Sequence, residues 1–254
     1  MLVFGVLVIS HGSQSEEWVR LVDEAVAGMR LPERTPVFSS FLEIVERRLI
    51  QDGIDALEAQ GVTDIIAVPL FISSGSTHID EISYALGVIP EPKLATDMKP
   101  FRLNARIHFA DPIGDDSTIA EIVYDKLRPL SSAPDKELVL LVGHGSKEPG
   151  FYEKWADGLA SLAGRIQALG GFAEADTAML LPDQAGQRLQ DWREKRPELQ
   201  VIVAPLFLSE GYFTSQVVPE RLQGYSFLYN GKALLPDERM SRWLEQAVLG
   251  FLNR

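Results

Sequence analysis

Two histidines and one acid lie where a metal ion could be bound and a proton accepted. His11 directly follows an apolar run within a Ser-His-Gly-Ser sequence, and Glu43 ends a Phe-Leu-Glu sequence. His78 lies in a polar, glycine-containing loop that leads into a predicted helix. Neutral imidazole is a common metal ligand and base, and a carboxylate at the end of an apolar strand is costly unless it is solvated, paired or functional. These residue types indicate metal or proton chemistry.

Structural interpretations of the same residues stay open at this point. The ring of His11 can equally bond a loop carbonyl or cap the next helix, and His144, in an equivalent sequence, has the same two interpretations. His78 can be an ordinary first-turn residue behind a serine or threonine cap. Glu43 can be a solvent-facing strand end or an acid in the first turn of a helix. His108 falls on a predicted strand and is interpreted as structural.

The chain contains an internal repeat. The apolar run that leads into His11 recurs before His144, 133 positions later, and the Pro-Leu-Phe sequence at 69–71 recurs at 205–207, 136 positions later. Two matches in the same order at nearly the same spacing predict a duplicated half. Residues 129–135 have the composition of a linker between the two copies.

We therefore expect two domains, 1–130 with the complete site and 137–254 with the site partly lost. In the second domain, the equivalents of the second histidine and of the acid are Thr214 and a position near Leu181. Neither residue titrates. Such asymmetry is expected when one site of a duplicated pair becomes scaffold.

Each half alternates short, continuously apolar runs with longer amphipathic stretches. Such runs are typical of strands covered on both faces, and strand–helix alternation predicts parallel sheets. The expected fold class is α/β, with two similar halves, each a mainly parallel sheet flanked by helices, and a cleft between them. Ligands of such folds bind beyond the carboxyl ends of the strands, where the candidate residues fall. In the first half we expect strands at 2–9, 36–42, 64–69 and 105–109, and helices at 16–29, 44–60, 79–86 and 117–127.

Composition excludes several classes of function. The 36 acidic and 24 basic residues give a net charge of −12, and such a surface repels nucleic acid and anionic membranes. The chain has no cysteine, which excludes disulfide frameworks, iron–sulfur clusters and a cysteine nucleophile. Glycine-rich nucleotide loops and the serine-hydrolase elbow are absent. The apolar N-terminal run lacks the features of a signal peptide and is shorter than a membrane span, so a cytoplasmic location is expected.

The ordered motifs resemble those of a known family. An apolar strand running into His-Gly-Ser, then Phe-Leu-Glu, then Val-Pro-Leu-Phe with a downstream Gly-x-x-His, is similar to the class II tetrapyrrole chelatases. The resemblance is to the sirohydrochlorin cobaltochelatase/ferrochelatase family in its long form, and it covers nearly the whole chain as two chelatase-like halves. It implies insertion of Co²⁺ or Fe²⁺ into sirohydrochlorin, for cobalamin or sirohaem synthesis, with release of two protons.

The resemblance also implies a role for each candidate residue. It makes His11 and His78 the metal ligands, with His11 a proton acceptor as well, and it makes Glu43 the acid that helps to relay the pyrrole protons. No organic cofactor is implied, and the divalent metal (Co²⁺, Fe²⁺ or Ni²⁺) is a substrate. The expected partners are the metal ion and the tetrapyrrole, for a chain that is a monomeric pseudo-dimer or a weak homo-oligomer. The serines expected to contact the polycarboxylate ring are Ser10, Ser13, Ser73 and Ser74.

The family pattern is not followed throughout, and other functions stay open. Asp80 and Glu81 follow His78 where family members have a longer spacer, either as further metal or substrate contacts or as a solvated helix start. The alternative function is a non-catalytic metal- or tetrapyrrole-binding protein derived from a chelatase. A degenerate structural paralogue that binds neither is a third hypothesis.

Overall fold

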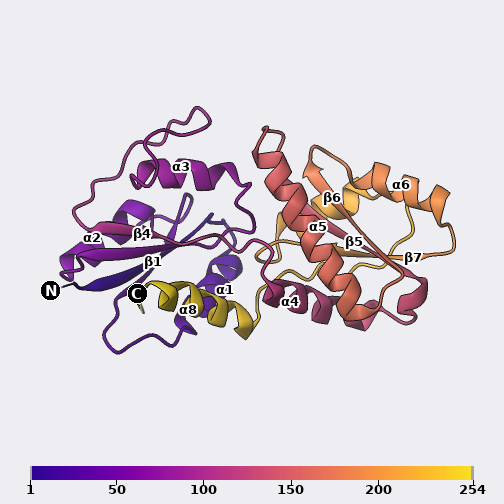
Figure 1. Cartoon of the computed structure of the whole chain (residues 1–254), viewed down its shortest axis with the longest axis horizontal. Coiled ribbons are helices and arrows are strands. Elements are labelled where there is room, and N and C mark those ends of the chain that lie inside the picture. Colours follow the sequence, from indigo (N-terminus) through magenta and orange to yellow (C-terminus); the bar gives the residue numbers. More distant parts are fainter. Residues whose placement is uncertain (1, 253–254) are drawn as a thin grey trace. The chain divides into compact units, whose positions relative to one another are not determined.

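The computed structural model describes residues 2–252 (Figure 1). The chain forms two compact units, one made of the residues up to Ile113 together with those from Asp237 onward, and the other made of Gly114–Pro236. Each unit has its own parallel sheet and its own hydrophobic core. The α/β class expected from the sequence, with two similar halves, is therefore confirmed.

The first unit contains a four-stranded sheet and four helices. Its elements are β1 (Phe4–Ser10), α1 (Glu16–Ala27), β2 (Val37–Phe41), α2 (Ile50–Ala59), β3 (Asp64–Pro69), α3 (Thr77–Ala85), β4 (Arg106–Phe109) and α8 (Glu238–Leu252). The strand order is β2-β1-β3-β4, and every pair is parallel. Leu7 and Ile9 of the central strand are fully buried in one cluster with Ile54 and Leu57 of α2. The continuously apolar run therefore marks a strand inside the core.

The second unit repeats the central part of this sheet. Its elements are α4 (Ser117–Leu127), β5 (Glu137–Gly145), α5 (Phe151–Gly170), β6 (Glu174–Leu181), α6 (Ala185–Lys195), β7 (Gln200–Pro205), a π-helical turn (Phe213–Val217) and α7 (Val218–Arg221), with 3-10 turns at Arg128–Leu130 and Pro134–Lys136. The strand order β6-β5-β7 is the order β2-β1-β3 of the first unit. The duplication seen in the sequence is thus a duplication of sheet topology.

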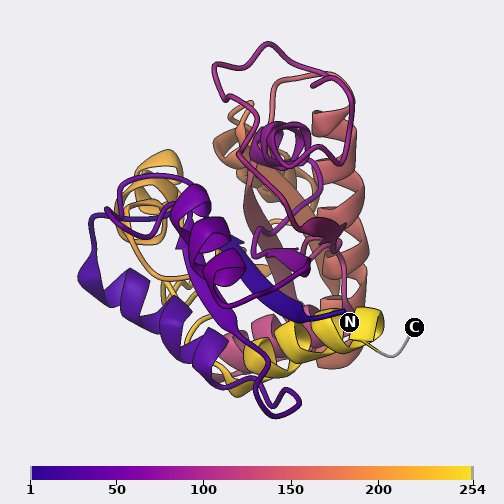
Figure 2. The same ribbon diagram turned by 90° about the vertical axis from the view of Figure 1, so that its left-hand side faces the viewer.

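The last helix of each sequence half packs in the unit that holds the other half's sheet. α4 packs on α5 and β7 in the second unit, whereas α8 packs on α1 and β3 in the first (Figure 2). Met240, Leu244 and Val248 of α8 are fully buried. The compact units therefore differ from the domains 1–130 and 137–254 that the repeat predicts, because shared burial, not order along the chain, decides which helices complete a core.

The helix expected at 44–60 begins only at Ile50. Residues 42–49 form a loop instead, in which Ile44 and Arg47 have φ angles of 74° and 62°. Positive φ is unusual for any residue with a side chain, and most of all for a β-branched one such as isoleucine. Such strain persists where the surrounding structure holds it in place, and this loop carries Glu43. Within residues 2–252, no helix is long and apolar enough to cross a membrane.

A buried hydrogen-bonded pair joins β3 to β4. Nε2 of His108 donates to Oδ1 of Asp64 at 2.9 Å, and the hydroxyl of Thr63 donates to Oδ2 at 2.8 Å. The Asp64 side chain is only 4% exposed. The hydrogen bond from His108 lowers the pKa of Asp64, against the opposing effect of burial. His108 therefore has a structural role, as its position on a strand indicated.

Because the pKa of Asp64 is lowered from its usual 3.8, the carboxylate stabilises the fold above that pH and loses this effect as the pH falls through the folded-state pKa. We expect Asp64→Asn to lower the free energy of unfolding by about 2 kcal/mol near neutral pH. The difference from the unmodified protein should shrink as the pH falls below about 4. Urea unfolding across this pH range measures both effects. The exposed Asp111→Asn is the control, and equal losses in the two variants would contradict the assignment.

Candidate functional site

The end of β1 lies against the start of the loop that follows β2. The amide of Leu42 donates to the carbonyl of Ser10 at 2.8 Å, and the amide of Glu43 donates to the carbonyl of His11 at 3.2 Å. Gly12 has a φ of +102°, and a Cβ there would overlap the carbonyl oxygen of Glu43. Glycine alone combines this φ with so close an approach. The His-Gly sequence thus brings His11 and Glu43 to one edge of the sheet.

The side chains of His11 and Glu43 face each other above this backbone contact. Nε2 of His11 lies 3.7 Å from Oε1 of Glu43, too far for a hydrogen bond. Nδ1 of His11 lies 3.2 Å from the carbonyl oxygen of Gly12. Because a carbonyl oxygen only accepts, Nδ1 carries the proton and Nε2 keeps its lone pair. The two side chains are 42% and 58% exposed, so both can meet a ligand from solvent.

α3 supplies the third residue. His78 lies in its first turn, and its ring centre is 5.0 Å from that of His11, with the planes at 69°. Nδ1 of His78 donates to Oε2 of Glu81 at 3.1 Å, which again leaves Nε2 with a lone pair. The ring of Phe71 lies beside His78, with centres 6.2 Å apart. The structure therefore brings Glu43 and His78 next to the ring of His11.

The two imidazoles lie close enough to share one metal ion. An ion about 2 Å from one nitrogen of each ring, at a tetrahedral angle, places the ring centres about 5 Å apart. The observed 5.0 Å allows this arrangement. Within residues 2–252, no group of three or more His, Asp or Glu side chains is arranged to hold a metal. Two nitrogen ligands leave the remaining coordination positions to water or to another ligand's nitrogens.

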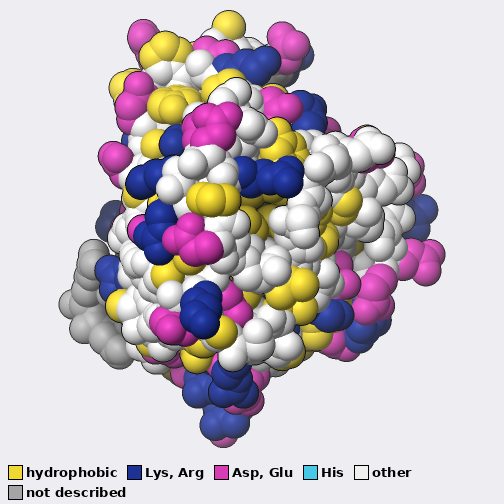
Figure 3. All heavy atoms as spheres, turned by 90° about the vertical axis from the view of Figure 1, so that its right-hand side faces the viewer, with side chains coloured by type: hydrophobic (Ala, Val, Ile, Leu, Met, Phe, Trp, Pro, Cys, Tyr) yellow, Lys and Arg dark blue, Asp and Glu magenta, His cyan; other side chains and the backbone are white. Residues whose placement is uncertain are grey.

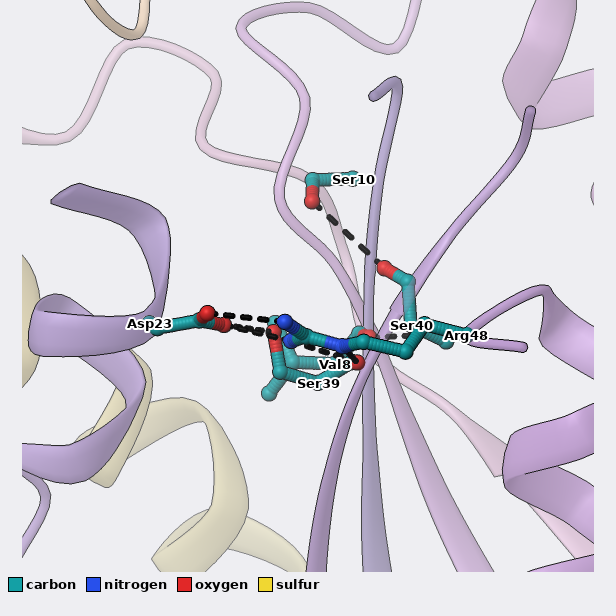
Figure 4. Close-up of polar contacts among 6 residues, drawn as sticks. All are labelled: Val8, Ser10, Asp23, Ser39, Ser40 and Arg48. Carbon is teal, nitrogen blue, oxygen red and sulfur yellow. Dashed lines mark hydrogen bonds and ion pairs between the residues drawn. The ribbon is translucent and has the colours of Figure 1, made fainter. Parts of the chain in front are cut away.

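The far end of the Glu43 loop is clamped to α1. Figure 4 shows the guanidinium of Arg48 against the carboxylate of Asp23, with N–O distances of 2.5 and 2.8 Å, and against the carbonyl of Ser39 at 3.0 Å. The same guanidinium lies over the ring of Phe41, 4.7 Å from its centre. A bidentate Arg–carboxylate pair fixes geometry as well as charge. The Arg48–Asp23 ion pair therefore fixes the end of the loop that carries Glu43.

Two of the four serines predicted to contact substrate are buried. Ser10 is fully buried, and its hydroxyl donates to the carbonyl of Ser40 at 3.5 Å (Figure 4). Ser73 is 7% exposed, and its hydroxyl accepts from the amide of Gly75 at 3.0 Å. In this structure these two hydroxyls stabilise a strand end and a turn and do not reach the surface.

The other two serines are accessible. Ser13 is half-buried and lines a surface groove of about 730 Å³ formed by α1 and the loop after β2. Its hydroxyl accepts from the amide of Ser15 at 3.1 Å, which leaves its proton available. Ser74 is half-buried on the loop before α3. Of the four predicted serines, Ser13 and Ser74 therefore stay candidates for substrate contact.

The second unit repeats the backbone contact without the acid. Nδ1 of His144 lies 3.1 Å from the carbonyl oxygen of Gly145, as in the first unit. Gly145 has a φ of +82°, and a Cβ there would overlap the carbonyl oxygen of Leu181. Leu181 thus occupies the position of Glu43, in agreement with the repeat.

The second unit also lacks the second histidine. Phe213 lies edge-on to His144, with ring centres 5.2 Å apart, and it stacks on Phe207 at 5.5 Å. The repeat placed Thr214 at the position of His78, but Thr214 is buried and it is Phe213 that contacts His144. Phe213, one residue before Thr214 and at the start of the π-helical turn, is therefore the residue that faces the imidazole. A phenyl ring cannot ligate a metal, so this unit presents a single imidazole.

Sequence reasoning missed the residues that support the site. Arg48 and Asp23 are separated by 25 positions, and nothing in their local sequences links them. Glu81 was noted as an extra acid but received no definite role. Its spacing from His78 could have indicated the role. Residues three apart on a helix lie side by side, so Glu81 is expected beside His78.

Comparisons with known proteins agree with the repeat and the fold. The CbiX family model matches residues 5–130 and 138–249. The chain is 30% identical to the sirohydrochlorin cobaltochelatase of Methanopyrus kandleri over 48% of this chain and 94% of that protein. It is 26% identical to the sirohydrochlorin ferrochelatase of Priestia megaterium over 85% of this chain and 77% of that protein.

A solved structure shows the same fold across both units. SirB from Bacillus subtilis, determined with Fe³⁺, matches with a TM-score of 0.72 at 20% identity, over 98% of this chain and 95% of that chain. At this identity the likeness concerns the fold. The family match, which spans nearly all of both halves, carries the assignment: this chain belongs to the CbiX family.

Proposed function

We propose that this protein is a sirohydrochlorin chelatase, which inserts Co²⁺ or Fe²⁺ into the tetrapyrrole. The observation that carries the proposal is the pair of imidazoles, His11 and His78, with ring centres 5.0 Å apart and Glu43 beside the first of them. The relatives named as cobaltochelatase and ferrochelatase support the same reaction. The reaction replaces two pyrrole protons by one divalent ion.

The site suits an ion that has to leave again. Two neutral imidazoles bind a borderline divalent metal less tightly than a thiolate would. The chain has no cysteine that could provide a thiolate. The incoming ring supplies four nitrogens, which outcompete two. The affinity order of such ligands favours Ni²⁺ over Co²⁺ and Fe²⁺, so we propose that metal supply in the cell selects between sirohaem and cobalamin precursors.

We propose Glu43 as an acceptor of protons from the ring. Its carboxylate is 58% exposed and lies 3.7 Å from Nε2 of His11. A base in that position takes a pyrrole proton as the metal moves from imidazole to pyrrole nitrogen, and its exposure lets it pass the proton to water. The neighbouring imidazole, once it has released the metal, can accept the second proton.

The substrate is a polycarboxylate, and the protein has a net charge of −12. On the face shown in Figure 3, where no histidine is visible, acidic and basic side chains are intermixed. We propose that local hydrogen-bond donors hold the ring's carboxylates, with the hydroxyls of Ser13 and Ser74 among them. Screening by salt weakens the remaining repulsion.

Removing either proposed ligand should slow insertion strongly. We expect His11→Ala and His78→Ala each to lower kcat/KM for Co²⁺ insertion into sirohydrochlorin about 100-fold at limiting metal. His144→Ala is the matched control, because Phe213 replaces the second ligand in its unit, and it should retain the rate within about twofold. The absorbance change of the tetrapyrrole measures the reaction. Full activity of His11→Ala and His78→Ala would refute the proposal, and metal or ring binding without turnover would support the carrier alternative.

Glu43→Gln should separate proton transfer from metal binding. The amide keeps the size of the side chain but cannot accept a proton, so we expect kcat to fall by about 10- to 100-fold. The dissociation constant for Co²⁺, measured by titration calorimetry, should change by less than about threefold. An equal loss of metal affinity would make Glu43 a ligand and would contradict the base assignment.

The two structurally equivalent glycines provide a second matched pair. Gly12→Ala and Gly145→Ala each place a Cβ against a carbonyl oxygen at positive φ, so each should lower the free energy of unfolding by about 3 kcal/mol. Only Gly12→Ala should also weaken Co²⁺ binding, by about tenfold, because it displaces the backbone between His11 and Glu43. Thermal unfolding and Co²⁺ titration below the transition measure these effects. Equal loss of metal affinity in both variants would contradict a single site.

A further inference from the structure

The two acids that follow His78 have separate and specific contacts. Asp80 is 6% exposed, and its carboxylate accepts from the backbone amides of Lys93 at 2.6 Å and Leu94 at 3.4 Å. Glu81 instead points to the site, where its Oε2 accepts from Nδ1 of His78 at 3.1 Å. Neither acid is merely a solvated helix start, which was one of the two interpretations that the sequence left open.

The other oxygen of Glu81 is held as well. The hydroxyl of Thr96 donates to Oε1 of Glu81 at 3.2 Å, and the same hydroxyl oxygen accepts from the amide of Met98 at 3.1 Å. The segment that carries Thr96 is anchored on both sides, at Asp80 as above and at Phe101, whose amide donates to the carbonyl of Ala85 at 2.8 Å. The carboxylate is therefore fixed between an anchored loop and the imidazole.

We propose that Glu81 is a positioning residue of the metal site, which holds His78 in the Nδ1–H tautomer and presents Nε2 to the ion. This inference rests on the proposed function, in which His78 is a metal ligand. A carboxylate that accepts the second ring proton of a metal-binding histidine fixes the tautomer and the ring orientation, and it increases the ligand's basicity. Thr96 in turn orients Glu81, and Asp80 holds the loop that carries Thr96.

The comparison between the two units supports this role. In the first unit His78 and Glu81 occur together, whereas residues 213–217 of the second unit read Phe-Thr-Ser-Gln-Val and contain neither a histidine nor an acid. Glu81 also does not complete a set of direct ligands, because no group of three such side chains suited to a metal occurs within residues 2–252. Its hydrogen bond is to the nitrogen of His78 that does not bind the ion.

Substitutions of Glu81 test the proposal in the full chain. Glu81→Ala removes the acceptor, so we expect Co²⁺ affinity to fall by about 10- to 30-fold. Glu81→Gln keeps an acceptor oxygen for Nδ1–H and should retain affinity within about threefold. Thr96→Val keeps the shape of the side chain and removes only its hydroxyl. We therefore expect Co²⁺ affinity to fall by about two- to threefold. Glu91→Ala removes the same charge from an exposed loop position and should leave the affinity unchanged.

A spectroscopic readout separates positioning from general structural damage. ¹⁵N NMR of the metal-free protein, with the four histidines assigned through single variants, reports which ring nitrogen carries the proton. His78 should show the Nδ1–H tautomer in the unmodified protein and in Glu81→Gln, and a shift toward Nε2–H in Glu81→Ala. His11 and His144, whose Nδ1 atoms face backbone carbonyls, should not change.

These measurements distinguish failure of the positioning role of Glu81 from failure of the proposed metal site. Unchanged Co²⁺ affinity in Glu81→Ala, beside a clear loss in His78→Ala, would overturn the positioning role and leave the proposed function intact. Equal losses in Glu81→Gln and Glu81→Ala would make the carboxylate itself a ligand and would also overturn it. If His78→Ala binds Co²⁺ normally, the proposed metal site fails, and the positioning role fails with it.

Discussion

The close approach of the backbone at Gly12 to the carbonyl of Glu43 is the contact on which the site depends. It occurs where β1 and β2 end side by side, and it requires both a positive φ and the absence of a Cβ. Two ladder hydrogen bonds that continue past the strands fix the same geometry. An imidazole and a carboxylate that lie 32 positions apart in the sequence are thereby held face to face, before any side-chain contact is considered.

The second unit has the same backbone contact without the acid and without the second imidazole. Gly145 and Leu181 repeat it closely, yet the acid is a leucine and the second imidazole is replaced by Phe213. The contact therefore does not depend on the acid or on the second imidazole, because both units have it. Aromatic stacking of Phe213 on Phe207 gives the second unit packing where the first unit has the second imidazole.

The sequence was sufficient for the sheet, the repeat and the gathering of His11, Glu43 and His78, because apolar runs mark buried strands and the carboxyl ends of parallel strands share one edge. It was insufficient where distant residues decide local structure. α2 begins only at Ile50, after a loop whose residue Arg48 is held by Asp23 on α1. Likewise, burial of Ser10 depends on the neighbouring strand.

Two further features required tertiary information. Helical spacing accounts for the contact of Glu81 with His78, but no local pattern connects Glu81 to its second partner, the Thr96 hydroxyl fifteen positions away. The exchange of α4 and α8 between units was also hidden, because an amphipathic helix shows that one face is buried but not against which sheet. The repeat divides the chain by sequence into halves, whereas the compact units are divided by which helix packs on which sheet.

The path of the chain sets an order of events during synthesis. A ribosome releases the first unit's sheet early, but α8, whose Met240, Leu244 and Val248 fill its core, emerges only after all of Gly114–Pro236. The second unit is one continuous segment and can fold as soon as it is released. The unit that bears the imidazole pair therefore completes its core last, and until α8 is released the apolar surfaces of α1 and β3 that α8 covers stay exposed to solvent.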